Sequence, residues 1–247
     1  MELLEGIHLI GSGAGGLGLT DPFDCHVYLI DGGAAAAIVD AGIGHSVDAL
    51  LANVQDAGVA LDRIRYLLLT HAHPDHSGGA AGLKRRLPEL SVVASPEVAS
   101  WVRAADERAM SLETGKKSEF YPADFSFEAC PVELEVADGE LVEVGSVALR
   151  VLEAPGHADG HLVFSARVGE RAVLFSGDVV FFGGRISLES NWDCHIQSYA
   201  STIAKLRHTA VDALLPGHHL MSLSDGRRHL ETAARLFERG FVPPSVV

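Results

Sequence analysis

The ten residues Thr70–Gly79, THAHPDHSGG, place three histidines and an aspartate within six positions, at His71, His73, Asp75 and His76. One helix face cannot hold all four side chains, because positions two apart point in different directions and Pro74 disfavours a helix interior. A strand would turn His76 away from the other three. We therefore expect an irregular loop in which the four side chains converge, with Pro74 helping to keep the backbone irregular.

This loop is a candidate metal-binding segment, because imidazole nitrogens and carboxylate oxygens are ligands that borderline divalent metals prefer. Three further polar residues follow apolar segments, each introduced by a glycine: His157, Asp178 and His218. Singly, each fits an ordinary turn, and the first cluster alone fits accidental grouping. Together they fit donors delivered from strand ends to one rim of the fold, where sites are commonly built.

Strands and helices must position these donors. Apolar segments bounded by turn residues predict strands within Cys25–Asp31, Ala34–Gly42, Ile64–Thr70, Leu90–Ser95, Ser146–His157 and Asp212–His219, and a hairpin over His161–Asp178 that turns at Gly169 and Glu170. Helical spacing with end signals predicts helices within Ser46–Gly58, Ser77–Pro88, Ser95–Met110, Ser198–His208 and Arg227–Gly240. Because the two kinds of element alternate in both halves, the sequence predicts an α/β protein with sheets inside and helices outside.

The segment Ser111–Pro131 mixes glycine, lysine, glutamate, aromatic residues and proline without a clean period. Long segments of this kind are usually functional or disordered. We interpret residues 111–131 as an extended loop and as a candidate lid over the site. No internal repeat or low-complexity linker divides the chain, so we expect residues 1–247 to form a single domain.

Composition narrows the class of partner. The chain has 247 residues, of which 47% are hydrophobic, and a formal charge of −14 from 19 basic and 33 acidic residues. Such a surface repels phosphate backbones, so we expect no nucleic-acid partner. No apolar run approaches the roughly 20 residues that cross a bilayer, so we expect no membrane partner.

The cysteines and the N-terminal residues indicate in which cellular compartment the protein is expected. Cys25, Cys130 and Cys194 form no CxxC pair, which favours reduced thiols. Met1–Gly13 lacks the basic start and sustained apolar segment of a secretory signal. Both observations favour a cytoplasmic protein.

The order HAHPDH, then GH, GD and GH, resembles the metallo-β-lactamase superfamily over almost the whole chain. GDVVFFGGRISL followed by SYASTIAKL is similar to its glyoxalase II-like branch. The resemblance implies a four-layer αββα sandwich, in which two mixed β-sheets lie face to face between helices. It also implies a dinuclear metal site at one edge of the two sheets.

Carried over position by position, the resemblance implies two sets of ligands and one bridge. One metal would be held by His71, His73 and His157, the other by Asp75, His76 and His218, with Asp178 between them. Water held by two cations loses its proton near neutral pH, with a pKa of about 7, and the resulting hydroxide would attack a carbonyl that one metal polarises. Asp75 and Asp178 are therefore the candidate catalytic carboxylates. Without thiolate ligands, two zinc ions are expected, although the same donors suit iron or manganese.

Four residues are candidates for supporting these ligands or contacting substrate. Asp40 ends an apolar segment and is expected to orient a ligating imidazole, the alternative being an ordinary turn aspartate. His161 and Tyr199 fit either this role or a core position, and Trp192, in a polar stretch, is the best candidate for lining a pocket. The GSGAGG segment matches GxGxxG, but no helix pattern follows it, so we expect a flexible loop beside the site.

The leading functional hypothesis is a metal-dependent hydrolase of an ester-like bond in a small molecule, a thioester or lactone, with a β-lactam as an alternative. A second hypothesis is an enzyme of the persulfide dioxygenase type, with one iron held by two histidines and an aspartate. A third is a non-catalytic metal-binding protein, which the complete seven-residue ligand set disfavours. The 29 residues after His218 lack the basic glutathione-binding motifs of glyoxalase II, so we do not expect hydroxyacylglutathione as substrate. A homo-oligomer is left open.

Overall fold

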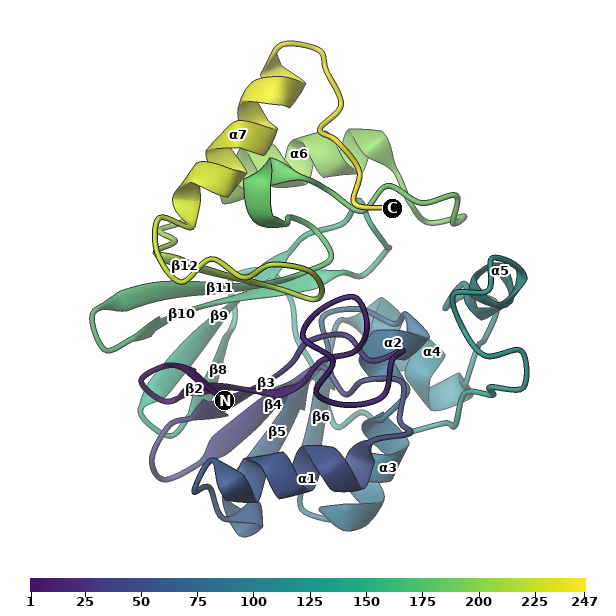
Figure 1. The fold of residues 1–247 in the computed structure, drawn as a ribbon, viewed down its shortest axis with the longest axis vertical. Coiled ribbons are helices and arrows are strands. Elements are labelled where there is room, and N and C mark those ends of the chain that lie inside the picture. Colours follow the sequence, from purple (N-terminus) through teal and green to yellow (C-terminus); the bar gives the residue numbers. More distant parts are fainter.

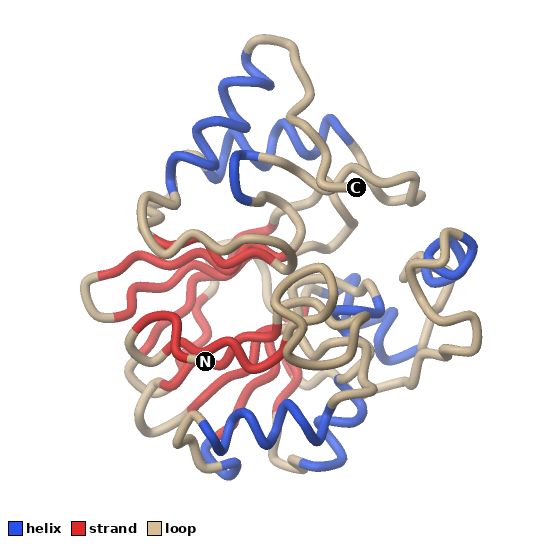
Figure 2. Tube along the Cα trace, in the orientation of Figure 1, coloured by secondary structure: helices blue, strands red, loops and turns tan.

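Two β-sheets lie face to face in the computed structural model, which describes residues 1–247, and helices cover both outer faces (Figures 1 and 2). The first sheet has seven strands in sequence order: β1 Glu2–Leu4, β2 Ile7–Gly11, β3 Val27–Asp31, β4 Ala36–Val39, β5 Ile64–Leu68, β6 Ser91–Ala94 and β7 Leu134–Glu135. The pairs from β1 to β4 are antiparallel, whereas those from β4 to β7 are parallel. This sheet is therefore mixed.

The second sheet has five strands in the order β12-β11-β10-β9-β8. Its members are β8 Leu141–Val144, β9 Val147–Glu153, β10 Leu162–Val168, β11 Arg171–Gly177 and β12 Ala213–Pro216. Only β11 and β12 run parallel, so this sheet is mixed as well. The αββα sandwich expected from the resemblance is confirmed.

Most of the helices lie in two groups on opposite sides of the sandwich (Figure 1). Their bounds are α1 Val47–Asp56, α2 Pro74–Ser77, α3 Ala80–Arg86, α4 Pro96–Ala104, α5 Leu112–Lys117, α6 Ile196–Leu206 and α7 Arg227–Glu238, with 3-10 turns η1 Leu61–Arg63 and η2 Phe182–Gly184. Apolar faces of α1, α3 and α4 pack on the first sheet, and those of α6 and α7 pack on the second. None of the helices has the length and apolar character needed to cross a membrane.

Central strands are apolar on both faces because each face is covered. In β3, Tyr28 and Ile30 belong to the core between the sheets, whereas Val27 and Leu29 belong to the core under α1, α3 and α4. Successive side chains of a strand point to opposite faces, so one short apolar run supplies both cores. The apolar core shared by the two sheets therefore holds them face to face.

Several expected boundaries are confirmed. The Ser95 hydroxyl accepts a hydrogen bond from the Val98 backbone N–H at 3.3 Å, and Pro96 is the first residue of α4. Gly58, just beyond α1, has a φ of +81°, the left-handed conformation that glycine adopts at helix ends. The hairpin of β10 and β11 turns between Val168 and Arg171.

Two local expectations are wrong. The candidate metal-binding segment is not irregular throughout, because Pro74 is the first residue of the four-residue helix α2. Proline is tolerated there because a backbone N–H at the first helical position has no partner within the helix. Residues 111–131 are not one extended loop, because they contain α5. A helix of six residues is too short to produce a recognisable helical period in the sequence.

Candidate metal centre

The candidate donors lie where strands of both sheets end at the same edge of the sandwich. His71 and His73 follow β5, and Asp75 and His76 lie on α2 directly after them. Second-sheet strands supply the other three, because His157 follows β9, Asp178 follows β11 and His218 follows β12. The glycine before His218 is required by this crowding, since a Cβ at Gly217 would lie 2.3 Å from Asp178 Oδ1. The structure thus brings all seven predicted donors together.

The first group of donors is His71, His73 and His157, whose ligand atoms lie within 4.8 Å of one another. His73 Nδ1 and His157 Nε2 are 2.9 Å apart. The Nε2 atom of His71 is buried and has no hydrogen-bond partner. Three imidazole nitrogens therefore face one small volume.

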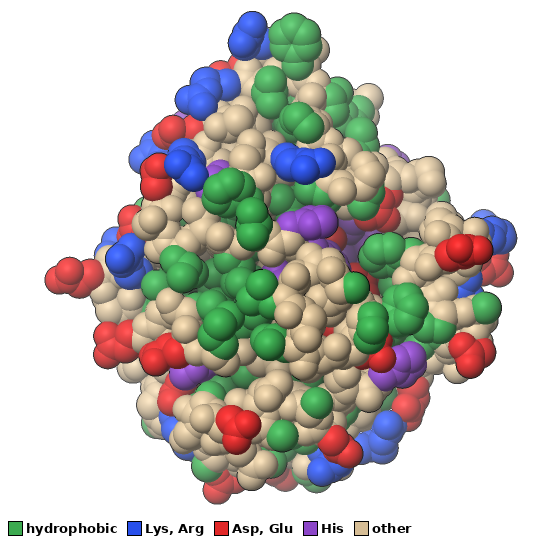
Figure 3. Space-filling model, viewed as in Figure 1, with side chains coloured by type: hydrophobic (Ala, Val, Ile, Leu, Met, Phe, Trp, Pro, Cys, Tyr) green, Lys and Arg blue, Asp and Glu red, His purple; other side chains and the backbone are tan.

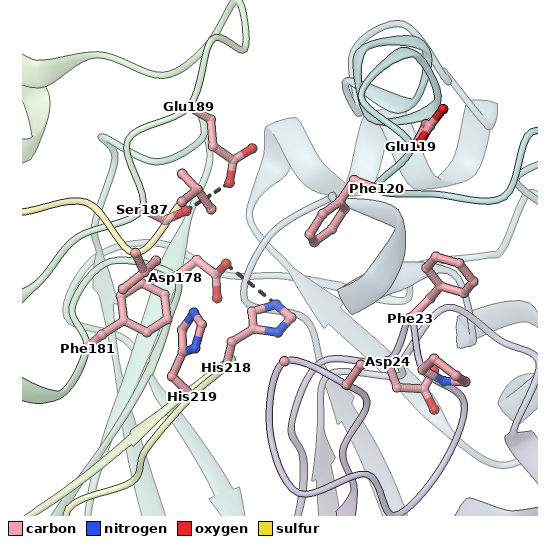
Figure 4. A pocket seen from close by; sticks show the side chains of 15 residues that line it. Phe23, Asp24, Glu119, Phe120, Asp178, Phe181, Ser187, Glu189, His218 and His219 are labelled. Carbon is pink, nitrogen blue, oxygen red and sulfur yellow. Dashed lines mark hydrogen bonds and ion pairs between the residues drawn. The ribbon is translucent and has the colours of Figure 1, made fainter.

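The second group is Asp75, His76 and His218. His218 Nε2 lies 3.0 Å from Asp75 Oδ2 and 3.3 Å from His76 Nε2. Asp178 lies between the two groups, with Oδ1 3.5 Å from His76 Nε2 and Oδ2 3.9 Å from His157 Nε2. Its Oδ2 is also 3.7 Å from His218 Nε2, the contact drawn in Figure 4.

The protonation states of three donors suit a cation. Burial alone would raise the pKa of Asp75, but the neighbouring His76 and His218 hold that pKa well below its usual range. Burial and the surrounding histidines lower the pKa of His71 and of His73. The carboxylate is therefore ionised and these two imidazoles are neutral, the states in which both ligate metals. In two other imidazoles, burial alone would lower the pKa, but neighbouring acidic groups raise the pKa of His76 and of His218, so both would release a proton on binding metal.

The donor set fits divalent metal ions. His71 Nε2 and Asp178 Oδ1 are buried without partners, a rare condition for polar atoms in a folded protein. Mixed imidazole and carboxylate donors suit zinc, iron or manganese. These histidines and aspartates are positioned to bind metal.

Asp40 connects the donors to the first sheet, as its position after β4 suggested. Its Oδ2 accepts a hydrogen bond from His76 Nδ1 at 2.8 Å, which directs His76 Nε2 toward the cluster. Its Oδ1 accepts from the Thr70 backbone N–H at 2.8 Å, and the Thr70 hydroxyl lies 3.0 Å from His71 Nδ1. One carboxylate thereby orients an imidazole of each group, the usual role of residues behind metal ligands.

His161 and Tyr199 contact Asp178 from behind. His161 Nε2 accepts a hydrogen bond from the Asp178 backbone N–H at 3.2 Å, and its ring stacks on His71 at 4.6 Å. The buried Tyr199 hydroxyl donates to the carbonyl oxygens of Asp178 and Ser187, at 2.9 and 2.8 Å. Both side chains are placed to hold Asp178, and because Tyr199 is fully buried it does not face substrate.

Trp192 does not lie at the donors, so its assignment as a pocket residue of this site is not supported. Its side chain is 54% exposed, packs edge-on against Trp101 at 6.1 Å, and donates from Nε1 to the Ala109 carbonyl at 3.3 Å. It borders a separate surface hollow with residues 106–114. Its neighbours in the sequence, Ser190 and Asn191, border the same cavity as His73, whereas Trp192 does not.

Residues absent from the sequence prediction also reach the cluster. The Tyr121 hydroxyl donates to Asp75 Oδ1 at 2.5 Å, and Asn191 Nδ2 lies 3.4 Å from His73 Nε2. Glu189 Oε1 lies 3.8 Å from His157 Nδ1. All three come from irregular segments without a motif, so only the folded chain identifies them.

Two adjoining cavities open onto the donors, and histidine side chains are visible near the middle of this face in Figure 3. The first, of about 300 Å³, borders Asp178 and His218 and has aromatic walls from Phe23, Phe120 and Phe181 (Figure 4). The second, of about 350 Å³, borders His73 and Tyr121. Neither cavity is lined by a lysine or an arginine.

The glycine-rich loop lies beside the first cavity, as expected, with Ala14 and Gly15 in its wall. His26 holds this loop, since its Nδ1 lies 3.0 Å from the Ser12 hydroxyl and its Nε2 lies 2.8 Å from the His219 carbonyl. Burial lowers the pKa of His26 from 6.5 to about 4. His26 is therefore neutral in the folded chain at neutral pH.

His26→Gln is expected to reduce the acid sensitivity of the fold. The unfolded chain binds the additional proton between pH 6.5 and about 4, so this contribution to stability is present above that window and lost as pH falls through it. At about 1.4 kcal/mol per pKa unit, the loss amounts to about 3 kcal/mol. Urea unfolding of both proteins in chelator, at several pH values, measures it. Equal acid dependence in the two proteins would contradict the assignment.

Comparison with known proteins gives consistent matches. The family model described as the metallo-beta-lactamase superfamily matches residues 20–223. A hydroxyacylglutathione hydrolase of Cupriavidus taiwanensis is 33% identical over 162 residues, which cover 65% of this chain and 51% of that protein. The human acyl-coenzyme A thioesterase MBLAC2 is 28% identical over 212 residues, covering 78% of this chain and 72% of that protein.

Solved structures agree on the fold. A metallo-beta-lactamase of Cronobacter sakazakii superposes with a TM-score of 0.73 at 19% identity, covering 97% of this chain and 95% of that one. The chain spans about half the length of the first two curated relatives that it matches.

Proposed function

The chain belongs to the metallo-beta-lactamase superfamily, and from this premise we propose that it is a hydrolase that cleaves small-molecule thioesters with two divalent metal ions. The observation that carries the proposal is the arrangement of the donors. His71, His73 and His157 form one group, Asp75, His76 and His218 form another, and Asp178 contacts members of both. Two groups with one shared carboxylate match the needs of a two-metal site.

Metal ions held there would supply a Lewis acid for the carbonyl and would lower the pKa of a bound water to about 7. The chain's own residues prepare this chemistry. Asp40 and Thr70 orient His76 and His71, and the ionised Asp75 is our candidate carboxylate for binding a metal and orienting the attacking water. His161 and Tyr199 hold the backbone of Asp178.

A thioester suits this site better than a lactam. A thiol has a pKa of about 8.5, so the sulfur leaves as an anion without needing a proton from the protein. An amine leaving group requires such a proton. The relatives point to the same bond, since two of them are named as a hydroxyacylglutathione hydrolase and an acyl-coenzyme A thioesterase.

The cavity lining favours a thiol leaving group that carries no carboxylates. Three phenylalanines, Phe23, Phe120 and Phe181, offer apolar area to an acyl chain. The charged side chains around them include Glu119 and Glu189, and no lysine or arginine offsets them. Carboxylates such as those of glutathione would be repelled near this rim.

A panel with one acyl group on different leaving groups tests the proposal. We expect hydrolysis of the N-acetylcysteamine thioester with a kcat/KM at least about tenfold above that of the glutathione thioester, which corresponds to ~1.4 kcal/mol of like-charge repulsion. Steady-state assays should include the matching lactone and a chromogenic lactam. No thioester turnover, or faster turnover of the lactam, would contradict the proposed bond.

Charge variants test whether glutamates at the cavity mouth cause the discrimination against the glutathione thioester. Glu119→Lys is expected to reduce the discrimination against the glutathione thioester, because Glu119 is exposed at the mouth of the first cavity. Glu5→Lys makes the same change in net charge at an exposed position that lines neither cavity, and serves as the control. Equal effects of both substitutions would assign the preference to net charge alone.

A further inference from the structure

Tyr121 belongs to the candidate lid, residues 111–131, and its hydroxyl donates a hydrogen bond to the metal-donor residue Asp75. We infer that Tyr121 is a positioning residue that fixes the Asp75 carboxylate and couples the lid to the second metal-binding group. The inference rests on the proposed two-metal function. It concerns a residue outside the seven donors and outside the motif that identified them.

The contacts of Asp75 divide between its two oxygens. Oδ1 accepts from the Tyr121 hydroxyl at 2.5 Å, while Oδ2 lies 3.0 Å from His218 Nε2 and 3.5 Å from His76 Nε2. The helix α2 places the Asp75 backbone, but rotation of a carboxylate about its last torsion is only weakly restricted. The Tyr121 hydroxyl selects the rotation that leaves Oδ2 facing the other donors.

The Tyr121 ring is itself tightly held. It is 6% exposed and packs within the apolar core under the first sheet. Gly115 of α5 allows this approach, because a Cβ there would lie 2.2 Å from the ring. The short helix α5 and the hydroxyl therefore fix Tyr121 from opposite ends.

The adjacent Phe120 connects this contact to the substrate cavities. Its ring lies edge-on to Tyr121 at 5.0 Å, and it lines both cavities. Phe120 therefore links the Tyr121–Asp75 contact to a wall of both cavities. Because coupling between the lid and the donors is reciprocal, a metal bound at the second group should in turn stabilise the Tyr121 contact and slow hydrogen exchange in residues 118–127.

Tyr121→Phe tests this assignment with a readout other than activity. It removes one hydroxyl and retains the packed ring. We expect the second zinc equivalent to bind 10–100-fold more weakly, the usual effect of losing a hydrogen bond to a metal ligand, with the first equivalent unchanged. Zinc titration against a competing chelator measures both affinities. Hydrogen exchange is expected to show metal-dependent protection of residues 118–127 in the unsubstituted protein and less in the variant.

Two further variants separate positioning from general damage. Tyr66→Phe removes the hydroxyl of a partly buried tyrosine that lines neither cavity, and is expected to change neither zinc affinity nor exchange. Gly115→Ala keeps the Tyr121 hydroxyl but displaces the ring, and should weaken the second equivalent although alanine is the better helix former.

The outcomes distinguish the inference from the proposed function. Two zinc equivalents in the unsubstituted protein, with unchanged affinity and protection in Tyr121→Phe, would overturn the positioning role and leave the proposed function standing. Absence of a second equivalent in the unsubstituted protein would overturn both. Weakening of the second equivalent in Tyr121→Phe and Gly115→Ala, but not in Tyr66→Phe, is the result that the structure supports.

Discussion

Asp178→Asn is expected to leave the chain folded and to lower kcat/KM for a thioester by at least about a thousandfold. The transition-state stabilisation at stake is several kcal/mol, and each 1.4 kcal/mol is about tenfold in rate. Asp178 is the carboxylate whose two oxygens approach both donor groups, with Oδ1 3.5 Å from His76 and Oδ2 3.9 Å from His157. An asparagine amide offers one neutral oxygen and turns an N–H₂ toward imidazole nitrogens, so one of the two contacts is lost.

The same preparation of Asp178→Asn should contain less metal per chain, measured by elemental analysis, while its circular dichroism spectrum stays unchanged. Asp62→Asn makes the same change in charge at an exposed position of η1 without hydrogen-bond partners, and should behave as the unsubstituted protein. Full activity at full metal content in Asp178→Asn would refute the shared-carboxylate assignment.

Removal of divalent metals by a chelator is expected to abolish hydrolysis and to destabilise the fold. Ions that bind only the native state stabilise it by about 2.7 kcal/mol at a free concentration one hundred times Kd. For a chain of this length, this corresponds to a rise in Tm of roughly 5–10 °C. We expect this effect because bound metals would neutralise the buried carboxylates of Asp75 and Asp178 and would give the unpartnered His71 Nε2 a ligand bond.

Activity and thermal unfolding should be followed together as metal is added back to the chelated protein. Zinc, manganese and iron should each be tried, because the donor set suits all three. Asp178→Asn serves as the control, and its Tm should respond less to added metal. Hydrolysis that persists in chelator, with no metal detected, would rule out a metal-dependent reaction.

The donors could be predicted from sequence because their signal is local. His71, His73, Asp75 and His76 occupy six consecutive positions, and His157, Asp178 and His218 each follow an apolar segment and a glycine. A polar residue that directly follows a strand lies at the edge of the sheet, and this placement depends only on the strand before it. Asp40 could be found for the same reason, since it directly follows β4.

Residues around the donors could not be predicted because their contacts depend on irregular backbone. Tyr121 reaches Asp75 across 46 positions of sequence, and Asn191 reaches His73 across 118. No periodicity specifies how such segments turn, so Trp192 was placed near the site although it lies outside both cavities. The short helices α2 and α5 were missed because too few residues carry their pattern.

The most direct test of the central claim is the metal content of the purified protein. It should be determined on the same sample that is assayed for hydrolysis of the N-acetylcysteamine thioester. Two divalent ions per chain with thioester hydrolysis is the result expected from the two donor groups and their shared Asp178. One iron per chain, with oxygen uptake and no hydrolysis, would contradict it and assign the site to a dioxygenase.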